Sequence, residues 1–513
     1  MNIFKKLVKH LITTIALFGF MLSINAQNFT IAPYLADPGY HSITIRWESD
    51  SKTIFFVNYG KTESFGKSKP AKFIAEKKGR YLYEANIDNL IKGRKYFYKV
   101  STENINSKHS SFRVGTKKNN TLSFAVLGDS RSKPHIFKAI ANQINEIDPS
   151  VIIANGDLVA KGGSYKNWQS QFFTPIKDIT NHIPFITAVG DHESDNVDGD
   201  DAALFTHFLF PHKDNLKLWF SYDFNDAHFV FLDWRYPDSK EMIEWFKKDI
   251  DNSDKKWKFV VMHRPPYNLG GHRVAWGRNV WPELFRNHKI DIVFSGHSHL
   301  YERFYPIRPL SQADSWAVTY ITTGGAGASL YEAIQHSSLA YTESINHFLK
   351  VQLKNNQIEL KALDVNGKVL DSISWSKNKG IVSPEYLATV TAQEELDIIN
   401  VFNAEISKRM ERLPMVEVPY QPVLKLSSLK INEDIEFTIR LAKESEGKYE
   451  MQSVSGILKA NTKLDIPLKI FGKSTLTVSK WGDLSPTLRL ITEYKTKTFK
   501  GNVTGKILEY IAW

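Results

Sequence analysis

The central part of the chain alternates short apolar runs with longer amphipathic segments. Two of the longer segments, Pro134 to Ile147 and Ser239 to Ile250, place their apolar residues on one side at helical spacing. The order of strand, loop and helix predicts an α/β domain. The predicted strands are Leu122 to Leu127, Val151 to Ala154, Pro184 to Val189, His228 to Leu232, Trp257 to Met262, Ile290 to Phe294, Trp316 to Thr323, Asn346 to Leu353, Gln357 to Val365 and Val369 to Trp375.

Both flanking regions show the strict alternation that is typical of half-buried strands. In residues 27–117 it is clearest from Arg94 to Val100, and we expect a β-sandwich with Trp47 buried in its core. In residues 415–513 it is clearest from Ile435 to Leu441 and predicts an all-β module of unknown role. This module is either a small sandwich for packing or dimer contact, or a polymer-binding domain.

At 513 residues the chain is too long for a single core and suggests about three domains. Between the central region and the last one, Thr391 and Glu394 have the spacing of a capping box, and a predicted helix ends at Pro414. We expect its apolar stripe to pack on the central domain; the stripe consists of Leu396, Ile399, Phe402, Ile406 and Met410. The resulting division is 1–26 signal peptide, 27–117 sandwich, 118–376 central domain, 377–414 linker and helix, and 415–513 terminal domain.

The first 26 residues have a basic start, an apolar run from Leu11 to Leu22 and a small residue at Ala26. This pattern predicts a secretory signal peptide, with an uncleaved anchor as the alternative. We therefore expect a secreted or periplasmic protein with no membrane contact after cleavage. The chain has no cysteine, which excludes disulfides, thiolate ligands and a lipid-modified cysteine. Its formal charge of +11 falls to +8 without Lys5, Lys6 and Lys9 of the signal segment (11 − 3 = 8), a modest excess that favours anionic substrates, and no dense basic block indicates a nucleic-acid partner.

Candidate chemistry gathers where the predicted central strands end. The segments LGDSR (127–131), NGDLV (155–159) and VGDHE (189–193) each place Gly-Asp after an apolar run, and VVMHRPPY (260–267) and SGHSHLYER (295–303) place histidines there. In open α/β sheets ligands bind at the carboxyl ends of the strands. One such aspartate would be an ordinary turn residue. Six acidic or histidine side chains at strand ends predict a shared site.

This ordered series resembles the calcineurin-like metallophosphoesterases, and GHSHLYER and VMHRPPY are most similar to the purple acid phosphatases. The resemblance covers residues 28 to 376 and implies a fibronectin type III-like domain followed by an α/β metallophosphoesterase fold, a β-sandwich flanked by helices. It also implies two divalent metal ions of Zn, Mn or Fe whose identity the sequence leaves open. Asp129, Asp157 and His299 would hold the first ion. The second would be held by Asp157, Asp191, His263 and His297.

The resemblance implies hydrolysis of a phosphorylated small molecule or polymer through a metal-activated hydroxide, because two metal ions activate water and neutralise phosphoryl oxygens. His192 is similar to the family histidine that protonates the leaving group. His272 lies in a Gly-Gly loop and is either a second candidate for the general acid or a solvated loop residue.

The chain departs from the family pattern at three positions. Ala160 stands where purple acid phosphatases have an iron-binding tyrosine, Asp191 replaces an asparagine, and Arg131 stands where many relatives have histidine. The first metal is left with three protein ligands and should bind more weakly. A guanidinium cannot bind a metal ion. Arg131 therefore either pairs with Asp191 or grips a phosphate oxygen.

The main hypothesis is an exported binuclear-metal phosphatase acting on phosphate monoesters. A phosphodiesterase or nucleotidase would use the same centre, and pocket shape would distinguish them. A non-catalytic binding protein on a decayed phosphoesterase fold is the alternative of another class. We expect the pocket to be shaped by Trp234, Tyr236, Tyr267, His272 and Trp276. The sequence indicates no oligomeric state.

Overall fold

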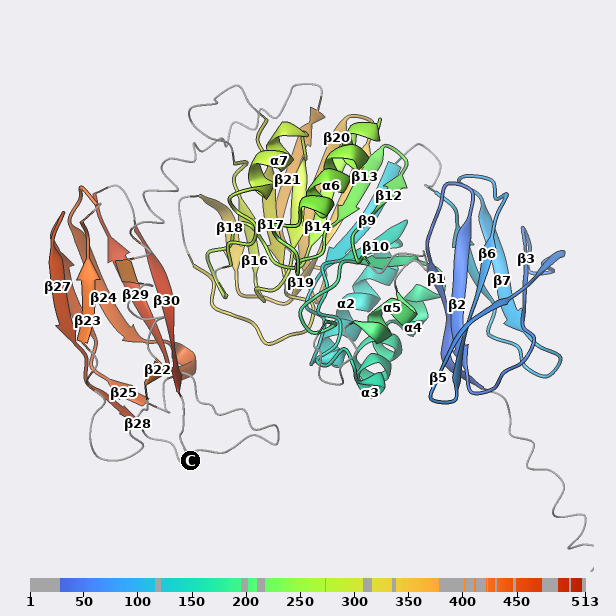
Figure 1. Ribbon diagram of the computed structural model, residues 1–513, viewed down its shortest axis with the longest axis horizontal. Helices are drawn as coiled ribbons and strands as arrows, with labels where there is room; N and C mark the ends of the chain where they lie inside the picture. The colour runs from blue at the N-terminus through green and yellow to red at the C-terminus, as the bar shows by residue number, and fades with distance from the viewer. Residues whose placement is uncertain are drawn as a thin grey trace, which may run out of the picture.

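The computed structural model is built mainly from β-sheets, with helices gathered in its central region (Figure 1). Among the described residues, no helix combines the length and apolar composition needed to span a bilayer. The signal-peptide prediction falls on residues outside the described part. The structure describes residues 28–115, 121–194, 202–209, 217–272, 274–307, 316–334, 338–377, 398, 401–402, 410–411, 421, 423–429, 431–445, 449–472, 488–497 and 500–509.

The first region consists of two four-stranded antiparallel sheets. Trp47, predicted to be buried, is fully buried between them and stacks on Tyr83 with ring centroids 5.9 Å apart. Tyr96, Tyr98 and Val100 lie on one buried face, as the alternation predicts. In spatial order the sheets are β1 (Phe29–Ala36), β2 (Ile43–Ser49), β6 (Arg80–Ile87), β5 (Lys72–Lys77), and β4 (Lys67–Pro70), β3 (Phe56–Gly60), β7 (Lys95–Ser101), β8 (Ser110–Arg113).

The central region contains two mixed sheets of six and seven strands. The six-stranded sheet runs β11 (Phe185–Thr187), β10 (Val151–Ala154), β9 (Thr121–Leu127), β19 (His347–Lys354), β20 (Gln357–Asp364), β21 (Val369–Ser376). The seven-stranded sheet runs β12 (Phe220–Phe224), β13 (Ala227–Phe231), β14 (Trp257–Met262), β15 (Ile292–Ser295), β17 (Thr319–Thr323), β16 (Tyr301–Phe304), β18 (Leu339–Glu343).

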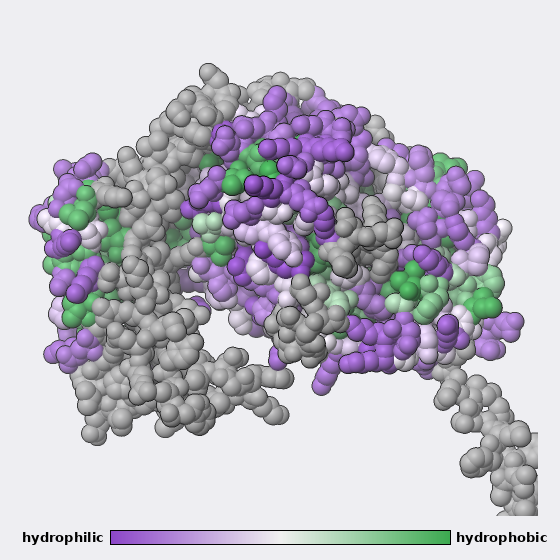
Figure 2. Space-filling model, viewed as in Figure 1, coloured by the Kyte–Doolittle hydropathy of each residue, from purple (hydrophilic) through white to green (hydrophobic). Residues whose placement is uncertain are grey.

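A buried aromatic cluster joins the two central sheets. Phe124 of β9 contacts Phe229, Phe259 and Phe294 of the other sheet, with ring centroids 5.0, 5.5 and 6.3 Å apart. Burying each phenylalanine side chain contributes about 1.5–3 kcal/mol. The polar residues are left to the outer surface, and Figure 2 shows the central region as mainly hydrophilic with scattered apolar spots.

Helices cover the outer faces of the central sheets (Figure 1). The predicted helix Pro134 to Ile147 is α2 with the same bounds, and the predicted helix from Ser239 is α6, whose N-cap is Ser239. One side carries α2 (Pro134–Ile147), α3 (Tyr165–Asn167), the π-helical turn η1 (Trp168–Phe173), α4 (Thr174–Thr180) and α5 (Ala203–Phe208). The other carries α6 (Lys240–Asn252) and α7 (Trp281–Asn287).

Parallel pairing brings the predicted site to one edge. Strands β9, β10 and β11 are parallel, as are β13, β14, β15 and β17 in the other sheet. Their carboxyl ends therefore open onto a common edge, where ligands bind in such sheets.

The last region is also made of strands. A five-stranded sheet runs β22 (Met410–Glu411), β30 (Lys500–Glu509), β29 (Leu488–Lys495), β24 (Ile435–Leu441), β26 (Val454–Leu458). Two pairs accompany it, β23 (Val423–Ser427) with β27 (Lys463–Pro467) and β25 (Tyr449–Met451) with β28 (Ile470–Gly472), together with the 3-10 turn η4 (Lys443–Ser445).

Of the predicted helical stripe, Met410 lies in strand β22 instead of a helix, and the predicted packing on the central domain is wrong for Phe402. Its ring contacts Phe437 and Tyr494 of the last region, with centroids 5.8 and 6.4 Å apart. An amphipathic pattern shows that a face is buried but does not choose between two sheets that could bury it. The capping box at Thr391 and Glu394 lies outside the described residues.

One buried histidine generates a pH-dependent prediction. His228 of β13 places Nδ1 2.7 Å from Asp223 and Nε2 2.9 Å from Asp249. Burial lowers its pKa, but the two hydrogen bonds outweigh this effect, and the pKa of His228 lies above its ordinary value. Because the folded-state pKa is raised, the stabilisation is complete below the unfolded pKa of about 6.5 and is lost as pH rises through the folded value.

The variant His228→Gln should therefore be less stable than the wild type by about 1.5–3 kcal/mol near pH 5, the contribution of a charged hydrogen bond. This difference should shrink as pH rises. Denaturant unfolding from pH 5 to 9 measures it, with Asp249→Asn expected to flatten the pH dependence. A difference that stays constant over this range would contradict the prediction.

Candidate metal centre

Three of the predicted ligand residues adopt a strained backbone conformation. Asp129, Asp157 and His297 have φ values of 57°, 57° and 68°. A residue other than glycine in this region costs about 1–3 kcal/mol, and such strain gathers at functional sites. Hydrogen bonds hold the conformation in place, because Asp129 N donates to the Gly156 carbonyl at 3.0 Å and Asp129 Oδ2 accepts from His297 N at 2.9 Å.

Glycines let the loops at the strand ends approach closely. A Cβ on Gly190 would lie 2.2 Å from Asp157 N, and one on Gly324 would lie 2.3 Å from the Ser298 carbonyl oxygen. The second glycine belongs to the glycine-rich segment TTGGAGAS (322–329), which begins at the end of β17. A side chain at either position would push the ligand loops apart.

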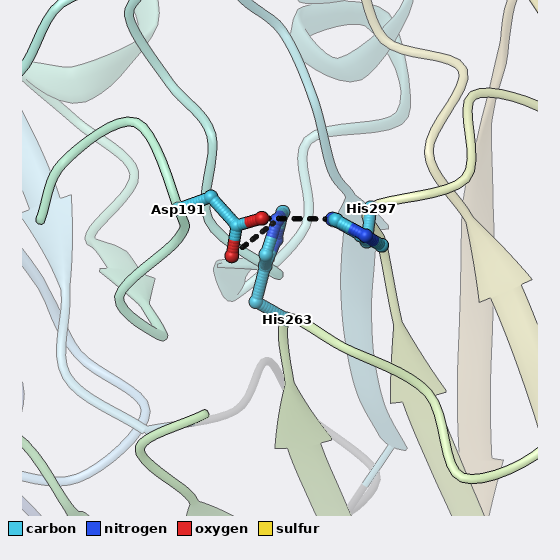
Figure 3. Close-up of side chains that lie close together, drawn as sticks. All are labelled: Asp191, His263 and His297. Carbon is cyan, nitrogen blue, oxygen red and sulfur yellow. Dashed lines mark ion pairs between the residues drawn. The ribbon is translucent and has the colours of Figure 1, made fainter. Parts of the chain in front are cut away.

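Asp191, His263 and His297, three of the predicted ligands of the second ion, form one cluster of candidate ligands (Figure 3). Their ligand atoms all lie within 4.8 Å of one another. Asp191 Oδ1 is 3.7 Å from His263 Nε2, and Asp191 Oδ2 is 3.1 Å from His297 Nδ1. One carboxylate and two imidazoles at such distances suit Zn, Mn or Fe.

Asp157 connects this cluster to another one on the side of the first ion, made of Asp129, Asp157 and His263. Its Oδ1 lies 3.3 Å from His263 Nε2 and accepts a hydrogen bond from His192 N at 3.0 Å. Its Oδ2 faces the other way, toward Arg131 at 3.3 Å. The two oxygens of this carboxylate therefore face two different sides, an arrangement that would let it bridge two ions.

His299, the remaining predicted ligand, places Nε2 3.4 Å from Asp129 Oδ1. It lies beside Asp129 as predicted, although neither three-residue cluster contains it. Its Nδ1 donates to the Ser329 carbonyl at 2.7 Å, and His263 Nδ1 donates likewise to the Asn155 carbonyl at 2.8 Å. Each backbone acceptor fixes the tautomer that leaves Nε2 with a free lone pair for a metal ion.

The donor set fits a metal ion. Asp129 Oδ1 and His263 Nε2 are buried, and neither has a hydrogen-bond partner among the described residues. Such atoms are expensive to bury unless something binds them. Six oxygen and nitrogen donors converge here, which is the composition that divalent transition metals prefer.

The electrostatics point the same way. Burial lowers the pKa of His263, but Asp157, Asp129 and Asp191 outweigh it and raise the pKa to about 9. Burial opposes ionisation of Asp191, yet the hydrogen bonds from His297 and Arg264 and the charge of His263 hold its pKa well below the ordinary range. The site therefore concentrates negative charge that would stabilise a cation.

The predicted alternative that Arg131 pairs with Asp191 is wrong, because Arg264 takes that place. Its Nε and Nη2 lie 3.0 and 2.9 Å from the two Asp191 oxygens, and its guanidinium stacks on Trp234 at 4.1 Å. Sequence reasoning missed this role. Arg264 directly follows the ligand His263, and that adjacency was the available signal.

The two predicted proton donors both lie beside the ligands. His192 donates from Nδ1 to the Ala160 carbonyl at 2.7 Å, which leaves Nε2 3.7 Å from Asp157 Oδ2. His272 is exposed and stacks on His297 with ring centroids 4.3 Å apart. Either imidazole could transfer a proton to a group held by the ligands.

Tyr331 is a neighbour that sequence reasoning missed. Its ring stacks on His299 at 4.4 Å, and its hydroxyl lies 3.0 Å from His272 Nε2. Arg489 of β29 lies over the same ring at 5.5 Å, so the last region reaches the rim of the site. Of the aromatic residues expected to shape the pocket, Trp276 instead packs in the core on Trp281.

Residues 122–301 match the family model described as calcineurin-like phosphoesterase. The chain is 28% identical over 295 residues to purple acid phosphatase 21 of Arabidopsis thaliana. The matched region covers 55% of this chain and 61% of that protein. It is 24% identical over 317 residues to a protein of the same plant named probable inactive purple acid phosphatase 27, covering 51% of each. The chain thus spans between half and about three fifths of these relatives.

The structure is similar to that of purple acid phosphatase PPD1 from yellow lupin seeds, with a TM-score of 0.59 and 21% identity over 67% of this chain and 74% of that one. The chain therefore contains a calcineurin-like phosphoesterase domain and is similar to purple acid phosphatases, as its motifs predicted. The fold is a metallophosphoesterase fold with mixed sheets in a chain of several regions. These similarities support the predicted class, a metal-dependent phosphoester hydrolase.

Glu193 holds the ligand loops together. Its carboxylate accepts hydrogen bonds from the backbone N–H groups of Asp157 and Leu158, both at 2.7 Å, and of Gly190 at 2.9 Å. This residue ends the motif VGDHE (189–193), whose sequence pattern alone indicates no role for it. Through these hydrogen bonds it fixes the backbone of the bridging aspartate.

Replacing Glu193 by glutamine should destabilise the protein by about 1–3 kcal/mol, because the amide nitrogen cannot accept and leaves a buried N–H group unsatisfied. Denaturant unfolding of the metal-free protein measures this loss. The control Glu359→Gln removes a surface ion pair with Lys361 and should change stability by at most about 1 kcal/mol. Equal stability of wild type and Glu193→Gln would show that these hydrogen bonds do not hold the loops.

Proposed function

We propose that this protein is an exported phosphatase that hydrolyses phosphate monoesters at a centre of two divalent metal ions. The observation that carries this proposal is the orientation of Asp157. Its carboxylate oxygens face different neighbours, Oδ1 toward His263 and Oδ2 toward Arg131. The similarity to purple acid phosphatases supports the reaction class. Two ions, when bound, would activate a water molecule and neutralise the charge of the phosphoryl oxygens.

The side chains around the ligands fit this chemistry. Arg131 is a permanently charged donor that could bind phosphoryl oxygens with two parallel hydrogen bonds. His192 and His272 flank the ligands on separate loops, and each could protonate a leaving oxygen. The metal identity is left to measurement, with Zn, Mn and Fe as the candidates.

The substrate would be a phosphorylated small molecule or polymer that meets the protein outside the cytoplasm. The basic start and apolar run within residues 1–26 support export, to the periplasm or the medium. A phosphodiesterase or nucleotidase is the alternative with the same centre. An aryl phosphate and a bis-aryl phosphate, compared across pH with added Mn or Zn, distinguish monoesterase from diesterase.

A binding protein without turnover is the second candidate function. It is favoured by Ala160, which replaces a family ligand, and by a relative that is named probable inactive. The six remaining ligand positions, all brought together at one edge, argue for catalysis. Absence of turnover on both aryl esters, in protein shown to carry metal, would favour the binding function instead.

Replacing Asp157 by asparagine should abolish nearly all turnover and reduce metal content. Substitutions of residues that only support metal ligands cost about 10–100-fold, so loss of a bridging ligand should exceed about 100-fold. Turnover of an aryl phosphate and elemental analysis measure the two effects. His299→Ala should mainly weaken the first ion.

Asp148→Asn makes the same chemical change at the left-handed residue that ends α2, and its turnover should match the wild type. Wild-type activity and metal content in Asp157→Asn would refute the assignment of the site.

A further inference from the structure

The guanidinium of Arg131 lies among the groups that would bind the first metal ion. Its Nε is 3.3 Å from Asp157 Oδ2, and its Nη2 is 3.4 Å from His299 Nε2. Its Nη1 is 3.4 Å from Ser132 Oγ. The side chain is largely enclosed, with 18% of its surface exposed. Two of the three predicted ligands of the first ion therefore face a cation that belongs to the protein.

A divalent ion and this guanidinium compete for the same lone pairs. An arginine side chain keeps its positive charge under all ordinary conditions, so deprotonation of Arg131 cannot end this competition. At 3.3 and 3.4 Å from Asp157 Oδ2 and His299 Nε2, the guanidinium occupies positions that an ion bound to the same atoms would need. Like charges at such separations also repel, and more so where the side chains are largely enclosed.

The second metal position has a different arrangement. Its arginine, Arg264, pairs with Asp191 and stacks on Trp234, and 34% of its side chain is exposed. Arg264 therefore contacts the ligand Asp191 from the partly exposed edge of the site. The oxygen that Asp157 turns toward this position, Oδ1, accepts a hydrogen bond from the backbone of His192 and lies beside His263. Arg264 thus pairs with a single ligand of this position, whereas Arg131 faces two ligands of the first, and the buried His263 Nε2 remains available to an ion with Arg264 in place.

We propose that Arg131 competes with the first metal ion and that a bound phosphoryl group releases this competition by drawing the guanidinium to itself. The inference rests on the proposed metal site and deepens it. The two positions are then unequal: the second ion is resident, and the first is held firmly only when Arg131 has an anionic partner elsewhere. By linkage, phosphate and the first ion strengthen each other's binding.

Metal uptake without turnover tests the proposal. The full chain without its first 26 residues is equilibrated with graded free Mn²⁺, and bound metal is counted by elemental analysis, with and without inorganic phosphate. In phosphate-free buffer, Arg131→Met should bind the first ion about 10–100-fold more tightly than the wild type, the range that a charged hydrogen bond supplies. Saturating phosphate should reduce this difference in affinity between the wild type and Arg131→Met.

Two further variants separate charge from general perturbation. Arg131→Lys keeps a positive charge and should stay closer to the wild type than Arg131→Met does. Arg440→Met removes an arginine that pairs with Glu493 at 3.0 Å in the last region and should leave metal uptake unchanged. Thermal unfolding of each metal-free variant shows that it has folded.

The outcomes distinguish this inference from the proposed function. If the wild type and Arg131→Met bind both ions with equal affinity, the competition is refuted and the metal site stands. The same holds if phosphate does not change the difference in affinity between the two proteins. Failure of every variant to bind any ion at millimolar Mn²⁺ refutes the metal site itself, and the inference with it.

Discussion

Negative charge gathered around one buried imidazole is the constraint on which the rest of the site depends. Three aspartates surround His263, whose side chain is fully buried, and they raise its pKa to about 9. Uncompensated charge in such a place costs several kcal/mol. Cations therefore gather here: the guanidinium of Arg264, that of Arg131 and, in the proposed function, metal ions. Each occupies a defined position because the carboxylates are rigidly placed.

That rigidity comes from the way the two sheets meet. The aromatic cluster around Phe124 joins them, and the parallel strands direct their carboxyl ends to one edge. Glycines allow the loops to touch there, and Glu193 joins the loop of Asp157 to that of Gly190 by hydrogen bonds. Strained backbone at the ligands persists because these surroundings overdetermine it. A preorganised donor set of this kind favours the catalytic function over a flexible binding surface.

Much of the site could be predicted because its residues follow apolar runs, and the end of a strand is visible in a sequence. The helix Pro134–Ile147 shows the same local clarity, since a proline begins it and its apolar spacing is regular. Contacts between distant loops leave no such local pattern. The pairing of Arg264 with Asp191, the stacking of Tyr331 on His299 and the packing of Phe402 on the last region all depend on tertiary geometry.

The central claim is that Asp157 lies between two cation positions of unequal character. Crystals grown with Mn²⁺ and measured at a wavelength where manganese scatters anomalously test it most directly. A strong anomalous peak bounded by Asp157 Oδ1, Asp191, His263 and His297 is expected, with a weaker or absent peak beside Asp157 Oδ2. Manganese bound only at sites remote from Asp157 would contradict the claim.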